Sequence, residues 1–321
     1  MRLLSRPPFL LVVLSLFLVT GAPASEFRPD HELALKILHS GEPDFSEGVA
    51  REFPPEESQL QIRRIGLRHD GMLIRAAFRD KTRRVPSTRK FRVRYLDTYY
   101  NEVAAYVVAR ALNLNLVPPT ILRSIGISTT GLKPSGKMRE GSLQLWVEDA
   151  AVEYDLRAGK LKYPGDPELK NLQLSEIHVF DCIIGNTDRH AGNILIELRP
   201  RVLLAQGPES APALSGKLWA IDQSRAFHGS TRLSDGHCKL DRLSFRPVSL
   251  RFLEGLRDWD SVRIESALTD AGLSAKQIDS LELQALEKRR RKVLERLLEM
   301  QRESGLDETE FFSSGYWHDV R

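Results

Sequence analysis

The chain has 321 residues, a mass of 36.4 kDa and a formal net charge of +4, and 41% of its residues are hydrophobic. This composition is ordinary for a globular protein, and the length is sufficient for one domain of two lobes with a sizeable core. The charge is too mild to require an anionic partner. No nucleic-acid-binding motif is visible, so we expect no nucleic-acid partner.

Residues 1–24 have the pattern of a secretory signal peptide. Two arginines among the first six residues precede the apolar segment Phe9–Val19, and the triplet A-P-A at 22–24 fits a cleavage site. The apolar segment is shorter than the roughly 20 residues that a membrane-spanning helix needs, so an uncleaved anchor is the weaker alternative. We therefore expect a mature chain that begins at Ser25, has no transmembrane segment and is secreted or extracytoplasmic, in a periplasm or in the lumen of a eukaryotic secretory pathway.

The residues after the signal peptide predict an extension followed by a hairpin. Residues 25–59 are polar and contain prolines, with one short helical candidate at His31–Leu38. Leu60–Arg64 and Met72–Phe78 are strand-like runs separated by the pair Asp-Gly at 70–71. Because Asp-Gly between strand-like runs favours a tight turn, we expect a β-hairpin here.

A basic segment and a helix follow the hairpin. Lys81–Arg94 carries seven lysines and arginines, and a solvated loop is the favoured interpretation. Its charge could also attract an acidic substrate or an anionic surface. Tyr99–Leu114 has apolar residues at helical spacing, and Glu102 lies in its first turn, where the helix dipole favours a carboxylate.

The most informative segment is Phe180–Leu195, which reads F-D-C-I-I-G-N-T-D-R-H-A-G-N-I-L, and an apolar strand further along ends at Asp222. Asp188, Asn193 and Asp222 occur in the order and first spacing that kinase-type phosphoryl transfer uses for a base and two metal ligands. Capping of helices explains an isolated D-x-x-x-x-N equally well, but the longer run is more specific. We therefore predict a phosphoryl-transfer site.

The two cysteines of the chain, Cys182 and Cys238, leave two interpretations open. An exported pair can form a disulfide, which would join the helix before the Asp188 loop to the segment after Asp222. Alternatively, Cys182 is a small buried hydrophobe. The chain then predicts three helices, at Ser249–Leu256, Val262–Ala271 and Ala275–Glu303.

The run N-x-D-R-H-x-x-N with a downstream I-D resembles the phosphatidylinositol 3-/4-kinase-like branch of the protein-kinase-like superfamily, which is similar to the secretory-pathway casein and proteoglycan kinases and to HipA-type kinases. The resemblance covers about Gln61–Phe227. It implies an α+β, two-lobed protein-kinase-like fold, with ATP as the nucleotide and Mg or Mn as the metal. The expected parts are a small β-rich lobe at 60–148, a mostly helical lobe at 149–305 and a tail at 306–321.

The resemblance also implies roles in the larger lobe. Asp188 would take the proton of the acceptor hydroxyl, and Asn193 and Asp222 would hold the metal. His190 would steady the transferring phosphate, whereas Arg189 would hold the loop.

In the small lobe, the strand before Asp80 resembles the one that carries a phosphate-binding lysine in relatives, but this chain has Arg79 there. Arginine is a planar fork and lysine a compact point charge, so the two are not interchangeable. Arg79 would contact the phosphates, or Lys81 would reach in instead, and Glu102 would orient either one. An exposed charge at the end of the strand is the alternative for Arg79. The Asp-Gly hairpin would form a lid over the phosphates.

The strand-like segment Gly141–Glu148 resembles the last small-lobe strand and the hinge. This implies that backbone groups of Trp146, Val147 and Glu148 meet the adenine, with Leu145 or Val147 packing on the base. A core position is the alternative for Trp146.

The sequence therefore predicts an exported kinase that transfers the γ-phosphoryl group of ATP to a hydroxyl of a protein or a small molecule. A nucleotide-binding pseudokinase or scaffold is the first alternative, because Arg79 replaces the expected lysine. A phosphoinositide-type lipid kinase is the second, and it ranks lower because no membrane module is evident. The third is an export-pathway interaction protein that uses the fold without a nucleotide.

Overall fold

The computed structural model describes residues 29–45, 62–85, 95–127, 134–198, 216–230, 238 and 248–312. The predicted signal peptide at 1–24, residues 86–94 of the basic segment and residues 313–321 of the tail lie outside the described residues. Within the described part of the chain, no helix combines the length and the apolar character that crossing a membrane requires.

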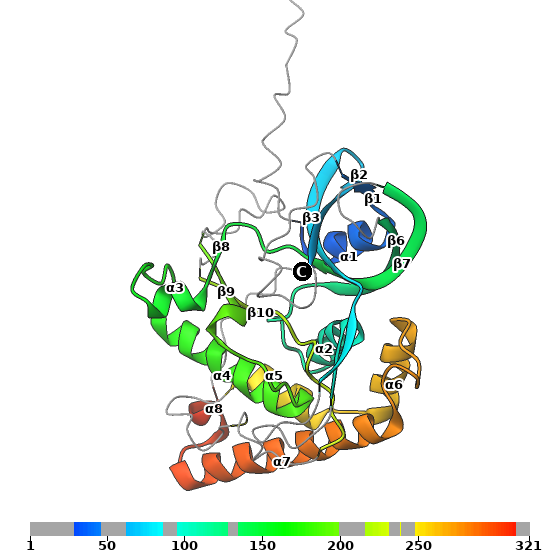
Figure 1. Ribbon diagram of the computed structural model, residues 1–321. Helices are drawn as coiled ribbons and strands as arrows, with labels where there is room; N and C mark the ends of the chain where they lie inside the picture. Colours follow the sequence, from blue (N-terminus) through cyan, green and yellow to red (C-terminus); the bar gives the residue numbers. More distant parts are fainter. Residues whose placement is uncertain are drawn as a thin grey trace, which may run out of the picture.

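The small lobe is a five-stranded antiparallel sheet wrapped around one helix (Figure 1). The sheet order is β1-β2-β3-β7-β6. The elements are α1 (His31–Ser40), β1 (Glu42–Asp44), β2 (Arg63–His69), β3 (Met72–Arg79), β6 (Thr120–Ile127) and β7 (Pro134–Leu145). Ile37 and Leu38 of α1 pack against Ile65, Phe78 and Leu143 of the sheet in a separate small core. The helix and β1, both within the expected extension, are thus part of the small lobe.

The predicted hairpin between β2 and β3 is confirmed, and His69 pairs with Met72 across it. Asp70 and Gly71 both have positive φ, 47° and 77°, as a type I′ turn requires. The turn lies at the opposite end of β3 from Arg79, about 23 Å along the strand at about 3.3 Å per residue. The expectation that this hairpin forms a lid beside Arg79 is therefore wrong.

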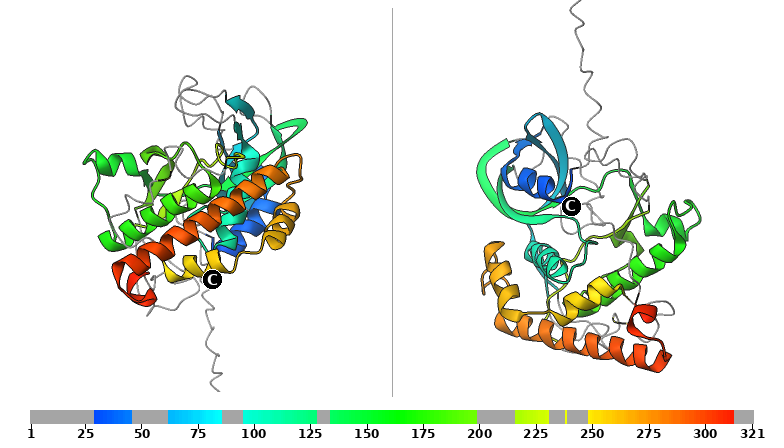
Figure 2. Two further views of the ribbon diagram at one scale, coloured as in Figure 1. Left: turned by 90° about the horizontal axis from the view of Figure 1, so that it is seen from below. Right: turned by 180° about the vertical axis from the view of Figure 1, so that it is seen from behind.

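The large lobe is mostly helical, and α7 lies alongside α4 in it (Figure 2). A three-stranded sheet of order β10-β9-β8 lies at its upper edge (Figure 1). Its elements are β8 (Ala150–Val152), α3 (Glu153–Arg157), α4 (Pro167–Ile184), η1 (Ala191–Asn193), β9 (Ile194–Glu197), β10 (Leu218–Ala220), α5 (Leu250–Arg257), α6 (Ser261–Asp270), α7 (Ser280–Ser304) and α8 (Glu308–Phe311). The predicted α+β, two-lobed architecture is confirmed.

The lobes meet at α2 (Tyr99–Ala111), which follows the two-stranded unit β4 (Thr82–Val85) and β5 (Tyr95–Thr98). The apolar side chains of α2, among them Val103 and Val108, belong to the large core that also contains Phe180 of α4. Helix α2 is therefore packed on the large lobe while it also contacts β6 and β7, and it carries Glu102 to the boundary between the lobes.

Helix α4 leads to the predicted catalytic loop and has clear ends. Asp166 caps its first turn and Pro167 occupies the first helical position, both favourable there. Gly185 ends it with φ 69°, and a Cβ at Gly185 would lie 2.8 Å from Nε2 of His228. The loop therefore starts at a position where glycine is required for both conformation and space.

The two cysteines form a disulfide, with Cα atoms 4.9 Å apart. The bond joins Cys182, in the last turn of α4, to Cys238, beyond Asp222. Of the two interpretations that the sequence left open, the disulfide is the one that the structure contains.

Candidate active site

The loop after α4 is held by the buried carboxylate of Asp181. Asn186 donates from Nδ2 to Asp181 (3.0 Å), and its Oδ1 accepts from the backbone N–H of Asp188 (3.0 Å). The Arg189 guanidinium donates to both oxygens of Asp181 and to the carbonyls of Asn193 and Ile221. Arg189 therefore braces the loop from inside and is almost fully buried, whereas His190 is exposed.

Asp188 and Asn193 lie together, as their spacing predicted. The Asn193 Nδ2 donates to the backbone carbonyl of Asp188 (3.2 Å). Because a carbonyl can only accept, this bond assigns the amide orientation and turns Oδ1 of Asn193 away from the loop backbone. The Asp188 carboxylate is about one-third exposed, with 31% of its side-chain surface accessible. Burial raises its pKa, and the charge of Arg225 opposes that shift.

Asp222 follows strand β10 in the left-handed conformation, with φ 57°, which Asp tolerates better than most residues. Its Oδ1 accepts from Ser224 Oγ (2.8 Å) and from Arg79 NH1 (2.9 Å). Burial raises the pKa of Asp222, but the charge and hydrogen bond of Arg79, with Ser224, hold that pKa below its usual range. The Asp222 carboxylate is therefore ionised and directed at Arg79 of the small-lobe strand β3.

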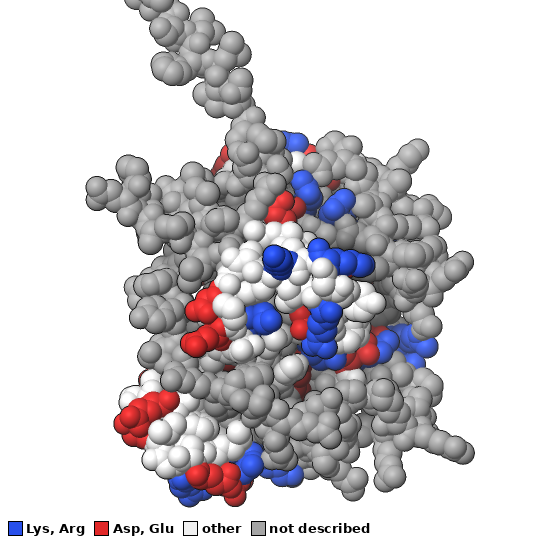
Figure 3. All heavy atoms as spheres, turned by 90° about the vertical axis from the view of Figure 1, so that its left-hand side faces the viewer, with Lys and Arg blue, Asp and Glu red and all other residues white. Residues whose placement is uncertain are grey.

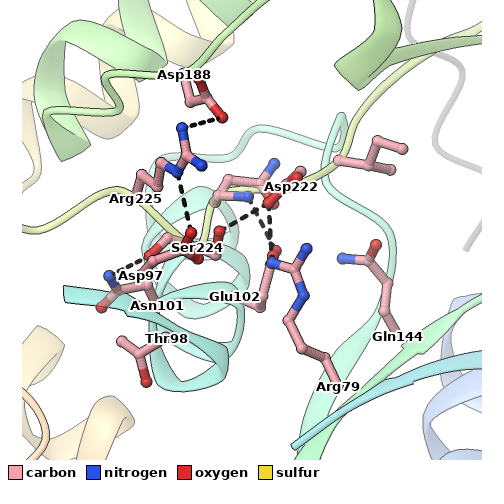
Figure 4. A network of polar contacts seen from close by, with 12 residues as sticks. Arg79, Asp97, Thr98, Asn101, Glu102, Gln144, Asp188, Asp222, Ser224 and Arg225 are labelled. Atoms are coloured by element: carbon pink, nitrogen blue, oxygen red, sulfur yellow. Dashed lines mark hydrogen bonds and ion pairs between the residues drawn. The ribbon is translucent and has the colours of Figure 1, made fainter. Parts of the chain in front are cut away.

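Arg79 joins the two lobes through Glu102 (Figure 4). Its NH1 is 2.6 Å from Glu102 Oε1, and both side chains are 7% exposed. Glu102 Oε2 accepts from the backbone N–H of Gln223 (3.0 Å), next to Asp222. Burial raises the pKa of Glu102 to about 7 against the opposing charge of Arg79. Of the two candidate phosphate ligands, Arg79 and not Lys81 contacts these carboxylates.

Lys81 lies beyond the end of β3, after Asp80. The Asp80 carboxylate is buried and pairs with Arg63 (3.2 Å) and Arg139 (2.7 Å) on the neighbouring strands. Lys81 itself is half-buried. Burial acts to raise the pKa of the Asp80 carboxyl, but the two arginines lower it. The charge of Lys81 makes a smaller contribution in the same direction as the arginines.

The linker Trp146–Glu148 connects the lobes, and its first residues are engaged with the small lobe. The Trp146 N–H donates to the Arg75 carbonyl (2.9 Å), and Arg64 lies over the indole ring. Glu148 forms an ion pair with Arg75 (3.1 Å). The Trp146 amide is thus directed at β3, and the adenine contacts of Val147 and Glu148 stay a prediction.

Gln144, just before this linker, faces the same side as Arg79 (Figure 4). The Thr120 hydroxyl donates to the Pro118 carbonyl (2.8 Å), so it accepts from Nε2 of Gln144 (2.9 Å). The orientation of the Gln144 amide is thereby assigned, with its oxygen as the remaining acceptor.

Sequence reasoning missed a second arginine with two carboxylate partners. Arg225 pairs with Asp97 (3.0 Å) and with Asp188 (2.8 Å). Its position three residues after Asp222, in the run I-D-Q-S-R, was a weak signal. Asp97 had no signal, because it lies 128 residues away in the chain.

The site therefore contains two arginine-centred triads, in each of which one arginine contacts two carboxylates. They are Glu102–Arg79–Asp222 and Asp97–Arg225–Asp188. A divalent cation would compensate negative charge on these carboxylates. Oδ2 of Asp222 and Oδ1 of Asn193 have no partner among the described residues, and both are oxygen ligands of the kind that Mg²⁺ and Mn²⁺ prefer.

These residues fit a cation that takes its other ligands from phosphates and water. Among the described residues, no three His, Cys, Asp or Glu side chains gather closely enough to hold a metal by themselves. Mg²⁺ is commonly bound by one or two protein ligands together with substrate phosphates. The donor set therefore suits a metal–nucleotide complex better than an isolated ion.

The surface charge of the described residues is mixed. Figure 3 shows Lys and Arg interspersed with Asp and Glu over the described part of the face that carries β8 and α3. Most of the basic segment Lys81–Arg94 lies outside the described residues, and an anionic contact through it stays a prediction.

No protein-family model and no curated protein matches the chain. Solved structures do match. A structure of hydra Fam20 with sugar is 14% identical, with a TM-score of 0.54 over 85% of this chain and 90% of that chain. The Golgi casein kinase is 17% identical, with a TM-score of 0.52 over 89% of this chain and 80% of that chain. The same kinase with Mn/ADP bound gives a TM-score of 0.52 at 17% identity, over 88% of this chain and 78% of that chain.

At these identities the likeness is one of fold. The chain has the two-lobed kinase-like fold of these proteins, with an antiparallel small-lobe sheet and a helical large lobe. The predicted resemblance to the protein-kinase-like superfamily and its secretory-pathway members is confirmed at the level of the fold.

Proposed function

We propose that this chain is an ATP-dependent kinase that transfers the γ-phosphoryl group to a hydroxyl of a protein or a small molecule. The observation that supports it is the meeting of Asp188, Asn193 and Asp222 with the buried Arg79–Glu102 pair at the boundary of the two lobes. The fold is shared with a kinase solved with Mn/ADP bound.

In the proposed reaction, Asp188 orients the acceptor hydroxyl and takes its proton. The acceptor oxygen forms a bond to the γ-phosphorus as the bond from that phosphorus to the β–γ bridging oxygen breaks, and ADP leaves with the electron pair. Arg79 presents a fixed positive charge to the phosphates, because Glu102 holds its guanidinium. His190 is exposed beside the base and would steady the transferring phosphate.

Asp222 and Asn193 would hold Mg²⁺ or Mn²⁺ through Oδ2 and Oδ1. When bound, the metal neutralises the phosphate oxygens and fixes their geometry. Arg189 keeps these ligands in place, because it binds the backbone carbonyls of Asn193 and Ile221.

We place the mature chain outside the cytoplasm. The Cys182–Cys238 disulfide is typical of oxidising compartments, and the similar Golgi casein kinase belongs by its name to the secretory pathway. The descriptions of these two similar proteins, a casein kinase and a protein solved with sugar, favour a protein or a small hydroxyl compound over a lipid as the acceptor.

A pseudokinase or scaffold is the second candidate. One observation favours it: Arg79 NH1 is already bound to Asp222 Oδ1, one oxygen of the proposed metal ligand. A pseudokinase would bind Mn–nucleotide without transferring phosphate.

The test combines a transfer assay with a binding assay. The purified chain from Ser25 onward is incubated with γ-labelled ATP and Mn²⁺, beside Asp222→Ala and the control Asp270→Asn, an exposed residue at the end of α6. We expect transfer of the label by the parent and the control, and none by Asp222→Ala. Equal labelling by all three proteins would show that transfer does not require Asp222.

Thermal denaturation with Mn–ATP separates the alternatives. Ligand at 100 times its Kd stabilises the folded state by about 2.7 kcal/mol, or about 5–8 °C for a protein of this size. Stabilisation without transfer would support the pseudokinase. No stabilisation would count against both nucleotide-binding functions and leave the interaction protein.

A further inference from the structure

We infer that Arg225 is a positioning residue for the phosphoryl transfer: it holds the Asp188 carboxylate by one oxygen so that the other oxygen meets the acceptor hydroxyl. The inference rests on the proposed function and deepens it. Figure 4 shows the Arg225 side chain extended from the segment after Asp222 to the side chain of Asp188.

First, the backbone around Arg225 is held by hydrogen bonds from neighbouring groups on both sides of this residue. The Thr98 N–H donates to the Ser224 carbonyl (3.0 Å), and the Asn101 Nδ2 donates to the carbonyls of Ser224 (2.8 Å) and Ala226 (2.9 Å). The carbonyl of Arg225 itself accepts from the Thr187 hydroxyl at 3.4 Å. Arg225 is therefore fixed relative to the residue that precedes Asp188.

The second step is the anchor of the guanidinium. Asp97 is 2% exposed, and its Oδ2 accepts from Arg225 Nε, while its Oδ1 has no hydrogen-bond partner in the part of the chain that the structure describes. A buried carboxylate with one partner holds that partner strongly, because its charge is otherwise uncompensated. Asp97 thus fixes the Nε end of the guanidinium, and NH1 of the same group lies beside Asp188.

The third step is the contact with the base. Arg225 NH1 lies 2.8 Å from Asp188 Oδ2, where the two side chains are 32% and 31% exposed. Oδ1 of Asp188 has no partner among the described residues. One carboxylate oxygen is thus held by the protein and the other can accept the acceptor's proton, and a fixed base shortens the search for the reactive geometry.

A purely structural role for Arg225 is the rival explanation. The docking of β5 and α2 on the large lobe is already made by the backbone of Thr98 and the side chain of Asn101. Removing the guanidinium leaves these bonds in place. A positioning role and a docking role therefore differ in what they change: the rate of transfer in the first case, folding and nucleotide binding in the second.

The test uses water as the acceptor, so that no substrate need be known. Hydrolysis of Mn–ATP by the chain from Ser25 onward is compared with Arg225→Met, Arg225→Lys and the control Arg263→Met on the exposed face of α6. We expect Arg225→Met to lower kcat at least tenfold, with KM for Mn–ATP and the Kd of Mn–ADP within twofold of the parent. Arg225→Lys should recover part of kcat, because it restores a charge beside Asp188.

A second variant protects the test against misfolding. Asp97→Asn/Arg225→Met removes the buried Asp97 charge together with its partner and should melt close to the parent, with kcat as low as in Arg225→Met. Parent-like or faster hydrolysis by either Met variant would overturn the inference while leaving the kinase intact, as would a loss of Mn–ADP affinity that parallels a loss of kcat. A parent chain that binds Mn–ADP but never turns over would overturn it together with the kinase reaction, and one that binds no Mn–ADP would overturn the proposed function itself.

Discussion

Replacing Arg79 with methionine tests the pair that joins the two lobes. The substitution leaves Glu102 and Asp222 without their shared counter-charge, and Glu102 is 7% exposed. Breaking a buried ion pair by removing one partner costs about 3–5 kcal/mol. At about 2–3 °C per kcal/mol for a protein of this size, we expect Arg79→Met to lower Tm by about 6–15 °C.

Two further experiments, Arg79→Lys and added Mn²⁺, test whether the loss of positive charge causes the change in Tm. A lysine keeps the charge but ends one atom earlier, so it cannot reach Glu102 and Asp222 as arginine does, and we expect an intermediate Tm. Mn²⁺ should restore part of the lost Tm in Arg79→Met, because it supplies a positive charge to Asp222, but none in Arg79→Met/Asp222→Asn.

Thermal denaturation by circular dichroism measures these changes, and Arg263→Met on the surface of α6 is the control for a lost arginine. If Arg79→Met melts within about 2 °C of the parent, a change too small for any buried ion pair, then the contact with Glu102 does not hold the lobes together. The assignment of Arg79 to the phosphates would lose its structural basis.

Three other predictions concern the fold around the site. Cys182→Ala opens a disulfide that spans 56 residues and should cost about 4 kcal/mol in urea denaturation, by the chain-entropy relation; a reductant should destabilise the parent equally and the variant not at all. Burial lowers the pKa of His31, so the unfolded state binds protons more readily at this residue; the contribution of His31 to stability should be full above about pH 6.5 and be lost as the pH falls below it, so the difference in the free energy of unfolding between the parent and a His31→Phe variant should change over that range. Gly185→Ala should lower Tm more than Gly159→Ala, because both glycines have positive φ but only the first Cβ would meet His228; equal losses would show that crowding has no part.

Local signals in the sequence predicted the parts of the site that lie on short segments. The spacing of Asp188 and Asn193 spans one loop and one turn of 3-10 helix, so few conformations are available and the two side chains must lie near each other. The Asp-Gly turn at 70–71 likewise needs only its own residues. Helix α4 likewise begins at Pro167 because Asp166 caps its first turn and Pro167 suits the first helical position.

Contacts between distant segments were beyond the reach of these signals. The small-lobe helix α1 was expected to be part of an extension, yet its apolar face fills the curve of the sheet. The Asp-Gly hairpin was correct as a turn and wrong as a lid, since the direction of β3 carries the turn away from Arg79.

The sequence by itself determined the chemistry available: a base, two oxygen ligands for a metal and a positive charge on the neighbouring strand, each set by residue type and short spacing. Only the tertiary structure decided which charges meet. It pairs Arg79 with Glu102 and Asp222, Arg225 with Asp97 and Asp188, and Cys182 with Cys238. The physical reason is that a side chain's electrostatic partners depend on how the lobes pack, and packing brings together residues more than a hundred positions apart.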